Sequence, residues 1–186
     1  MVLALPRGGV PVAAEVAAAL AAPLDVLVVR KLGVPWQPEL GMVAIGEGGV
    51  RVLDPDIVRT AGVTTDQIDT VIARERAELE RRVARYRESR PMVAVRGRVV
   101  VIVDDGIATG GTARVAVQVA RGLGATRVVL ASPVAPIDAV RDLRMVADDV
   151  AVVATPWPFV AIGPWYEDFT QTTDDEVRAA LRDAAG

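Results

Sequence analysis

The most informative segment of the 186-residue chain runs from Val99 to Thr112 and reads VVVIVDDGIATGGT. Its first five residues are apolar and β-branched, which predicts a strand buried on both faces. Two adjacent carboxylates, Asp104 and Asp105, follow at the end of this strand. A turn rich in Gly and Thr then leads to a predicted helix that begins at Thr112. The segment is therefore expected to be a strand, a loop and a helix in series.

The loop of this segment predicts a binding site for a sugar phosphate. Backbone N–H groups of the turn and of the helix start carry partial positive charge, and Gly110 and Gly111 let a phosphate approach closely. Thr109 and Thr112 add hydroxyl donors. The two carboxylates would repel the same phosphate, so they are better suited to accept hydrogen bonds from sugar hydroxyls beside it.

Competing interpretations of the acidic pair fit less well. Asp residues at a strand end often only cap a turn, but here they are joined to Thr-Gly-Gly-Thr at a helix start. A receiver domain would need a Lys on a later strand, whereas the single Lys of the chain, Lys31, lies upstream. A P-loop NTPase would need the pattern Gly-x-x-x-x-Gly-Lys-Ser/Thr, which the sequence lacks.

Short apolar runs alternate along the chain with Ala-rich or amphipathic segments of helical length. This alternation predicts an α/β fold in which helices cover both faces of a largely parallel sheet. Strands are expected at residues 2–5, 24–29, 99–103, 128–131 and 150–153, and helices at residues 12–22, 67–88, 112–123 and 137–145. Ligands of such sheets bind beyond the carboxyl ends of the strands, so the loops at those ends form the candidate site.

Two further strand ends carry basic residues. Arg7-Gly8-Gly9 follows the first predicted strand, and Arg30-Lys31 follows the second. Residues 33–49 are rich in Gly and Pro, which favours a mobile loop leading into a hairpin near residues 42–52. We expect one domain over residues 1–186, with this loop, a helical insertion at about 55–90 and a C-terminal hood at about 156–186.

Composition excludes several classes of function. Apolar residues make up 52% of the chain and charged residues 24%, which is typical of a globular domain with a sizeable core. The net charge of −3 and the pI of about 5.1 leave no basic excess for nucleic acid or an anionic membrane. The chain has no Cys and no His, which excludes thiol nucleophiles, imidazole bases and most zinc sites. The longest apolar run, residues 10–24, is too short to span a bilayer, so we expect a cytoplasmic protein.

Residues 99–112 resemble the 5-phosphoribosyl-1-pyrophosphate (PRPP) binding motif of type I phosphoribosyltransferases. The resemblance implies that Asp104 and Asp105 hold the ribose 2′- and 3′-hydroxyls. It also implies a 5′-phosphate loop made of Gly106, Ile107, Ala108, Thr109, Gly110, Gly111 and Thr112. Arg7-Gly8-Gly9 is similar to the pyrophosphate loop of this family, and Arg30-Lys31 is similar to the basic pair that meets pyrophosphate.

The resemblance extends over residues 3–49 and 128–177, where the chain looks like a bacterial subgroup described only as predicted phosphoribosyltransferases. The fold that it implies is α/β, with a five-stranded, mostly parallel sheet, helices on both faces and a small hood. Members of the subgroup tend to have one more helix before the first strand, whereas this sequence begins on that strand. A truncated or misassigned start would leave part of the core uncovered.

The activity implied by the resemblance is Mg²⁺-dependent transfer of the phosphoribosyl group of PRPP to a nitrogen of a nucleobase-like acceptor, with release of pyrophosphate. PRPP itself would hold the Mg²⁺, with Asp104 and Asp105 as further candidate ligands. Position 108 is Ala where 6-oxopurine enzymes of the family have an Asp general base, and Ser132 follows Ala131 where they have a Lys. Hypoxanthine and guanine are therefore disfavoured as acceptors.

Two further groups of residues have both a functional and a structural interpretation. Glu39 and Glu47 lie in the predicted mobile loop. Each is either a solvated surface residue or the general base of the transfer reaction. Phe159, Trp165 and Tyr166 belong to an aromatic cluster that either packs in the core or forms a wall for the acceptor.

Two other functions are consistent with the same predicted sugar-phosphate site. A non-catalytic sensor would bind PRPP or a nucleotide without turnover. A hydrolase or phosphorylase would pass ribose phosphate to water or to phosphate. For the transferase, the expected partners are PRPP, a small nitrogenous acceptor and a second copy of the chain in a homodimer.

Overall fold

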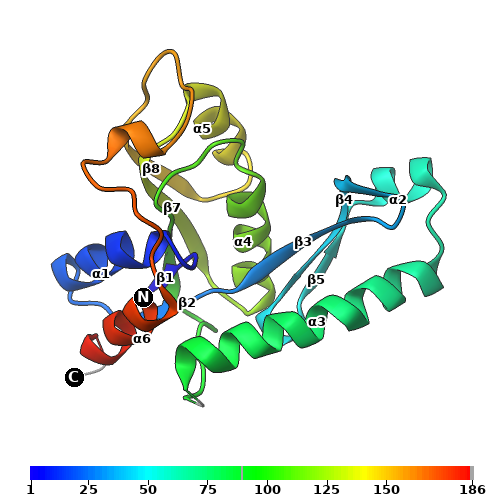
Figure 1. Ribbon diagram of the computed structural model, residues 1–186, viewed down its shortest axis with the longest axis horizontal. Coiled ribbons are helices and arrows are strands. Elements are labelled where there is room, and N and C mark those ends of the chain that lie inside the picture. The colour runs from blue at the N-terminus through cyan, green and yellow to red at the C-terminus, as the bar shows by residue number, and fades with distance from the viewer. Residues whose placement is uncertain (89, 185–186) are drawn as a thin grey trace.

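A five-stranded parallel sheet forms the centre of the computed structural model, which describes residues 1–88 and 90–184 (Figure 1). The strand order is β2-β1-β6-β7-β8, and each neighbouring pair is parallel. The predicted α/β sheet is thereby confirmed. Its strands are β1 (Val2–Ala4), β2 (Leu24–Val26), β6 (Val99–Val103), β7 (Arg127–Val134) and β8 (Asp149–Ala154).

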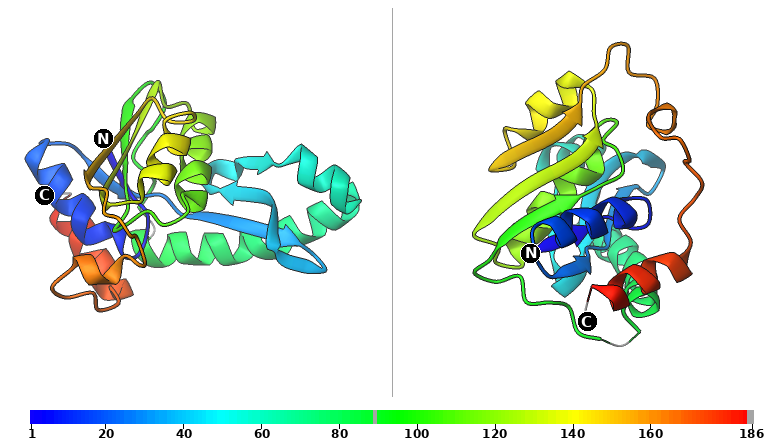
Figure 2. Two further views of the ribbon diagram at one scale, coloured as in Figure 1. Left: turned by 90° about the horizontal axis from the view of Figure 1, so that it is seen from above. Right: turned by 90° about the vertical axis from the view of Figure 1, so that its left-hand side faces the viewer.

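Helices cover both faces of this sheet, as expected (Figure 2). α1 (Gly9–Ala19) packs on one face, and α4 (Gly111–Gly122) and α5 (Ile137–Leu143) pack on the other. Successive strand residues point to opposite faces, so β6 supplies Ile102 to the core beneath α4 and Val103 to the core beneath α1. Because the five strands are parallel, the loops that follow their carboxyl ends meet at one edge of the sheet.

On the face of the central sheet that carries α1, the edge strand β8 is not covered by a helix of the described residues. Along β8, the residues Asp149, Ala151 and Val153 are exposed, and Val153 is 90% exposed. Parallel sheets usually have both faces covered, so this apolar edge of the sheet is unusual.

A second sheet projects from the central sheet together with a long helix (Figures 1 and 2). Its strands are antiparallel, and the predicted hairpin near residues 42–52 corresponds to its last two strands. The elements in this part of the chain are β3 (Val29–Val34), β4 (Gln37–Gly46), the 3-10 turn η1 (Glu47–Gly49), β5 (Arg51–Leu53), α2 (Pro55–Ala61) and α3 (Thr65–Arg87).

Residues 33–49 are not the irregular loop that their Gly and Pro content predicts, because most of them form β3 and β4. The hairpin of β3 and β4 lies between α3 and α4, and these two helices bury its apolar residues on both faces. The buried residues include Leu32, Val34, Met42 and Val43. The predicted strand at 24–29 is also divided, since β2 ends at Val26 in the central sheet and β3 begins at Val29 in the second one.

The long helix α3 agrees with the sequence prediction. It begins with a capping box, in which the Thr64 hydroxyl accepts from the Gln67 N–H and the Gln67 side chain accepts from the Thr64 N–H. Ile68 and Leu79 are buried on one face, and the opposite face is charged and exposed. Among the helices that the structure describes, α3 included, none has the length and apolar character that crossing a bilayer requires.

A C-terminal helix, α6 (Asp174–Asp183), is absent from the sequence-based prediction. The Thr173 hydroxyl caps it by accepting from the Glu176 N–H at 3.2 Å, and Val177 and Leu181 are buried where the helix packs on α1 and α3. The predicted hood thus consists of two parts, an irregular segment and α6. The irregular segment, residues 155–173, contains the 3-10 turn η2 (Gly163–Trp165) and is called the hood loop below.

A buried ion cluster joins the two sheets to the end of α3. Arg87 donates from Nε to Asp25 Oδ1 at 2.8 Å and from Nη2 to the Val26 carbonyl at 2.7 Å. It also pairs with Glu47, whose Oε1 accepts from the Val28 N–H at 2.9 Å. The three charged side chains are at most 7% exposed. The cluster therefore fixes the base of the hairpin to the central sheet.

We expect the substitution Arg87→Met to destabilise the protein by about 3–5 kcal/mol, because two buried carboxylates lose their cation. The matched control Arg74→Met removes an Arg of the same helix whose side chain is 86% exposed. It should change the free energy of unfolding by less than about 1 kcal/mol. Urea unfolding measures both variants. Wild-type stability of the Arg87→Met variant would show that the carboxylates do not need the guanidinium.

Candidate functional site

The loops after β1 and β6 lie directly against each other at the carboxyl ends of these strands. A Cβ atom on Gly8 would lie 1.9 Å from Asp105 Oδ2, and one on Gly9 would lie 2.6 Å from the Val103 carbonyl oxygen. Both glycines therefore permit a contact that any side chain would block. The structure thus brings Arg7-Gly8-Gly9 and the acidic pair together, as their positions at strand ends predict.

Asp104 has an unusual protonation equilibrium. Its Oδ1 accepts a hydrogen bond from the Asp105 N–H at 3.0 Å. Burial, together with the negative charge of Asp105, raises the pKa of Asp104 to about 7. The ionised form of Asp104 is therefore energetically disfavoured near neutral pH. A ligand that brings hydroxyl donors or a cation to this place would stabilise it.

The loop from Gly106 to Thr112 is anchored at its start and open further along. Ile107 is buried and donates its N–H to the Val134 carbonyl at 2.9 Å. Gly110 has a φ of +75°, the left-handed conformation that favours glycine, and the next residue begins α4. The exposed residues are Ala108, Thr109 and Thr112. The start of α4 therefore presents its N–H groups to an open surface, which suits a phosphate.

The two members of the basic pair have different surroundings. Arg30 forms an ion pair with α3, its Nη2 lying 2.7 Å from Glu75 Oε2. Lys31 reaches the phosphate loop instead, because a Cβ atom on Gly111 would lie 3.9 Å from Lys31 Nζ. On the way, its side chain crosses Gly41 of β4, where a Cβ atom would lie 2.0 Å from Lys31 Cε. Lys31 is thus the member of the pair that can reach a ligand at the loop.

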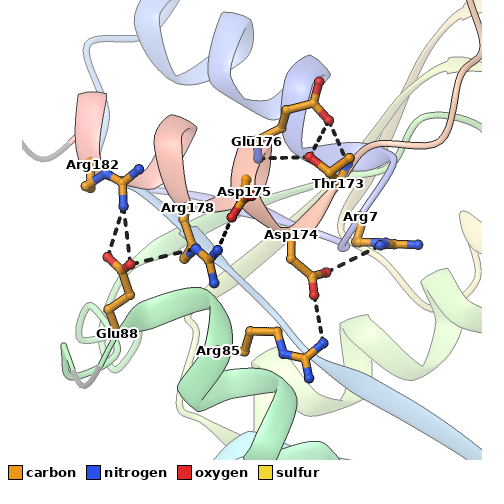
Figure 3. A network of polar contacts seen from close by, with 9 residues as sticks. All are labelled: Arg7, Arg85, Glu88, Thr173, Asp174, Asp175, Glu176, Arg178 and Arg182. Atoms are coloured by element: carbon orange, nitrogen blue, oxygen red, sulfur yellow. Dashed lines mark hydrogen bonds and ion pairs between the residues drawn. The ribbon is translucent and has the colours of Figure 1, made fainter.

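Arg7 lies beside the same site and contacts the C-terminal helix (Figure 3). Its Nη1 is 3.4 Å from Asp174 Oδ1, and the other oxygen of Asp174 accepts from Arg85 Nη1 at 2.8 Å. The Arg7 side chain is 32% exposed. Its guanidinium therefore remains accessible to an anion.

The hood loop is tied to the acidic pair. Tyr166 donates its hydroxyl to the Asp105 carbonyl at 2.5 Å. Ile162 packs on Gly106, where a Cβ atom would lie 2.4 Å from Ile162 Cγ2. Burial and the two neighbouring carboxylates raise the pKa of Tyr166 to about 12, so its hydroxyl remains a donor at neutral pH.

The remaining predicted site residues have differing surroundings. Phe159 is half-buried and Trp165 is exposed in the hood loop, and their role as an acceptor wall stays a prediction. Glu39 is exposed on β4 and stays a candidate general base. Glu47 is buried and paired with Arg87, so its carboxylate is not available for proton transfer. We therefore exclude the general-base interpretation of Glu47.

The acidic pair supplies oxygen ligands of the kind that Mg²⁺ prefers. Within residues 1–88 and 90–184, no group of three or more His, Cys, Asp or Glu side chains is arranged as a metal site. Two carboxylates do not complete the six-oxygen shell of Mg²⁺, so an ion held by Asp104 and Asp105 would need about four further oxygens from a phosphate ligand and water.

Gly41, Ile162 and Asp174 are parts of this site that sequence analysis does not identify. Ile162 and Asp174 contact residues far away in the sequence, and Gly41 meets Lys31 only through the pairing of β3 with β4, so no local pattern reports these contacts. Residues 173–176 read Thr-Asp-Asp-Glu, a capping-box pattern that predicts the start of α6. Nothing in that pattern indicates which side chain Asp174 meets.

Comparisons with known proteins place this fold and site in one family. The family model of the phosphoribosyl transferase domain matches residues 1–167. A Mycobacterium tuberculosis protein named "Putative phosphoribosyl transferase Rv0571c" is 57% identical over 181 residues, which are 97% of this chain and 41% of that protein. The chain thus spans about two fifths of the length of this curated relative.

A solved structure is also closely similar. The crystal structure of TT1426 from Thermus thermophilus is 45% identical in sequence and superposes with a TM-score of 0.90. The match covers 100% of this chain and 88% of that one. Together with the family model, these matches show that the chain belongs to the phosphoribosyl transferase domain family.

Proposed function

We propose that this chain transfers the phosphoribosyl group of PRPP to a nitrogen of a nucleobase-like acceptor and releases pyrophosphate. One observation carries the proposal: the acidic pair, the glycine-rich start of α4 and Lys31 meet at one edge of the central sheet. Membership of the family supports phosphoribosyl transfer in general.

The ribose phosphate part of PRPP binds at two points. The N–H groups at the start of α4 and the hydroxyls of Thr109 and Thr112 bind the 5′-phosphate. Lys31, which the resemblance assigns to pyrophosphate, adds its positive charge at the 5′-phosphate instead, because its Nζ lies beside Gly111. Asp104 and Asp105 accept hydrogen bonds from the ribose hydroxyls. Because both points lie on one strand-loop-helix segment, the fold fixes the distance between them.

The leaving pyrophosphate gains negative charge as its bond to C1 of the ribose breaks and the acceptor nitrogen bonds to C1. Arg7 stabilises this charge from the loop after β1, where its position does not have to change during the reaction. Mg²⁺ bound to PRPP supplies further charge neutralisation at the pyrophosphate. Glu39, exposed on β4, is the candidate to accept the proton that the acceptor nitrogen loses.

The residues around the acceptor argue against a 6-oxopurine. Ala108 has no group that could accept a proton. Ser132 is buried and donates its hydroxyl to the Val134 carbonyl at 3.1 Å, so it is not free to read a base. Phe159 and Trp165 of the hood loop suit a flat, nitrogen-containing ring instead.

Pyrophosphate release from PRPP and Mg²⁺, measured with a panel of purine and pyrimidine bases, tests the proposal. Release that depends on one base supports transfer. Release without any base indicates a hydrolase, and calorimetric binding of PRPP without release indicates a sensor. Absence of PRPP binding would overturn every version of the proposal.

Replacing both members of the acidic pair, Asp104→Asn with Asp105→Asn, should weaken PRPP binding roughly a hundredfold or more, because each carboxylate-to-hydroxyl bond contributes about 1.5–3 kcal/mol. Asp138→Asn is a suitable control, since Asp138 lies exposed on α5. Calorimetry measures the affinities. Unchanged affinity of the double variant would remove the acidic pair from the site.

Asp104→Asn alone should stabilise the ligand-free protein most at alkaline pH. The pKa of Asp104 is about 7 in the folded chain against 3.8 without its surroundings, so the folded state binds more protons between these values. Wild-type stability therefore falls across this window as the pH rises, on the order of 1–3 kcal/mol from this group, and the variant avoids the loss. Chemical unfolding at about pH 4 and about pH 8 measures it. An equal gain at both pH values would contradict the raised pKa.

Gly41→Ala should weaken binding of ribose 5-phosphate about tenfold, which corresponds to the loss of one charge-assisted contact. Its Cβ would take the place of Lys31 Cε, so the flexible Lys side chain must leave the loop while the fold is kept. Lys31→Met should have a similar effect, and Gly41→Ala should add nothing to it. Arg30→Met should leave the affinity unchanged, because Arg30 pairs with Glu75. Wild-type affinity of the Gly41→Ala variant, measured by calorimetry, would remove Lys31 from the 5′-phosphate.

A further inference from the structure

The helix α6 lies outside the part of the chain that the family model matches. That match ends at residue 167, whereas α6 begins at Asp174. Its first residue nevertheless contacts Arg7 in the loop after β1, 167 positions away in the sequence. An element beyond the segment that the family model matches thus reaches the residue that we assign to pyrophosphate.

The backbone at Asp174 is held in place independently of Arg7 (Figure 3). Thr173 and Glu176 form a capping box at the start of the helix. Further along, Arg182 Nη1 lies 3.2 Å from Glu88 Oε2, beyond the end of α3. Two buried residues, Val177 and Leu181, add apolar packing. Asp174 is therefore a fixed point against which a mobile side chain can be oriented.

The charges around Asp174 leave a positive excess. Its carboxylate lies between two guanidiniums, those of Arg85 and Arg7. The hydrogen bond from Arg85, followed by the charges of Arg85 and Arg7, lowers the pKa of Asp174, so the group is ionised at neutral pH. One carboxylate cannot neutralise two guanidiniums. Since only Nη1 of Arg7 contacts Asp174 in the described structure, the other donors of that guanidinium are left for an anion.

We propose that Asp174 is a positioning residue that holds the Arg7 guanidinium where the pyrophosphate end of PRPP binds. This inference rests on the proposed function, because it assumes that Arg7 meets pyrophosphate. A long Arg side chain samples many rotamers, and ordering it is part of the cost of binding. A fixed carboxylate restricts those rotamers before the ligand arrives.

The carboxylate of Asp174 has a second, opposite effect, because it repels a pyrophosphate anion nearby. The two effects can be separated. Repulsion acts whether or not Arg7 is present, whereas positioning requires Arg7. A double-mutant cycle between the two residues therefore isolates positioning from repulsion.

The cycle compares wild type, Asp174→Asn, Arg7→Met and the double variant, with pyrophosphate affinity measured by calorimetry in the presence of Mg²⁺. Relative to its effect in the Arg7→Met background, Asp174→Asn should weaken pyrophosphate binding about three- to tenfold. Ribose 5-phosphate affinity should not change, since its phosphate binds at the start of α4. Asp174→Glu keeps the charge and should recover part of the loss.

Asp175→Asn is the matched control. Asp175 also lies in the first turn of α6, but it pairs with Arg178 of its own helix. It should not alter pyrophosphate affinity, so an equal loss in this variant would show that α6 stability, not Arg7, is responsible. An additive cycle would likewise overturn the role of Asp174. A wild-type chain that binds neither PRPP nor pyrophosphate would overturn the proposed function itself, which separates the two failures.

Discussion

The buried guanidinium of Arg87 is the contact on which the geometry of this protein depends. It bonds to Asp25 on β2, to the Val26 carbonyl and to Glu47 directly after β4, so one side chain connects the central sheet, the hairpin of β3 and β4, and α3. Removing three charges from water is costly, and only complete hydrogen bonding makes such a cluster tolerable. The consequence of the cluster is positional. The chain has two residues between β2 and β3, and the cluster fixes the direction in which the hairpin leaves, which brings Lys31 to the phosphate loop.

Several residues of the site are unfavourable for the ligand-free fold. Asp104 is a partly buried carboxylate beside a second one, and Lys31 places a cation near the positive end of the α4 dipole. Each feature becomes favourable when a sugar phosphate binds, because the ligand brings hydroxyl donors to the acids and negative charge to the loop. Proteins commonly accept this loss of stability where a ligand is to bind.

The sequence predicts the central sheet and the phosphate loop because their information is local. Val99 to Thr112 forms strand, loop and helix from consecutive residues, and its strand is apolar throughout because both faces are buried. The sequence predicts an irregular loop in place of the hairpin because the pairing of β3 with β4 shifts register at Gly33, which interrupts the two-residue alternation of a strand. Glu47 and Asp174 illustrate a different limit. Their partners, Arg87 and Arg7, are 40 and 167 positions away, so only the folded chain reveals what these carboxylates do.

The two ends of the proposed reaction are built differently. The ribose phosphate end rests on a strand, a helix start and glycines, elements whose geometry the sheet determines. The proposed acceptor end rests on the hood loop, an irregular segment outside the central sheet. The two ends are nevertheless joined, because Tyr166 bonds to the Asp105 carbonyl and Ile162 packs on Gly106. In the proposed reaction, a change in the packing of the hood loop therefore reaches the ribose site through the backbone of Asp105.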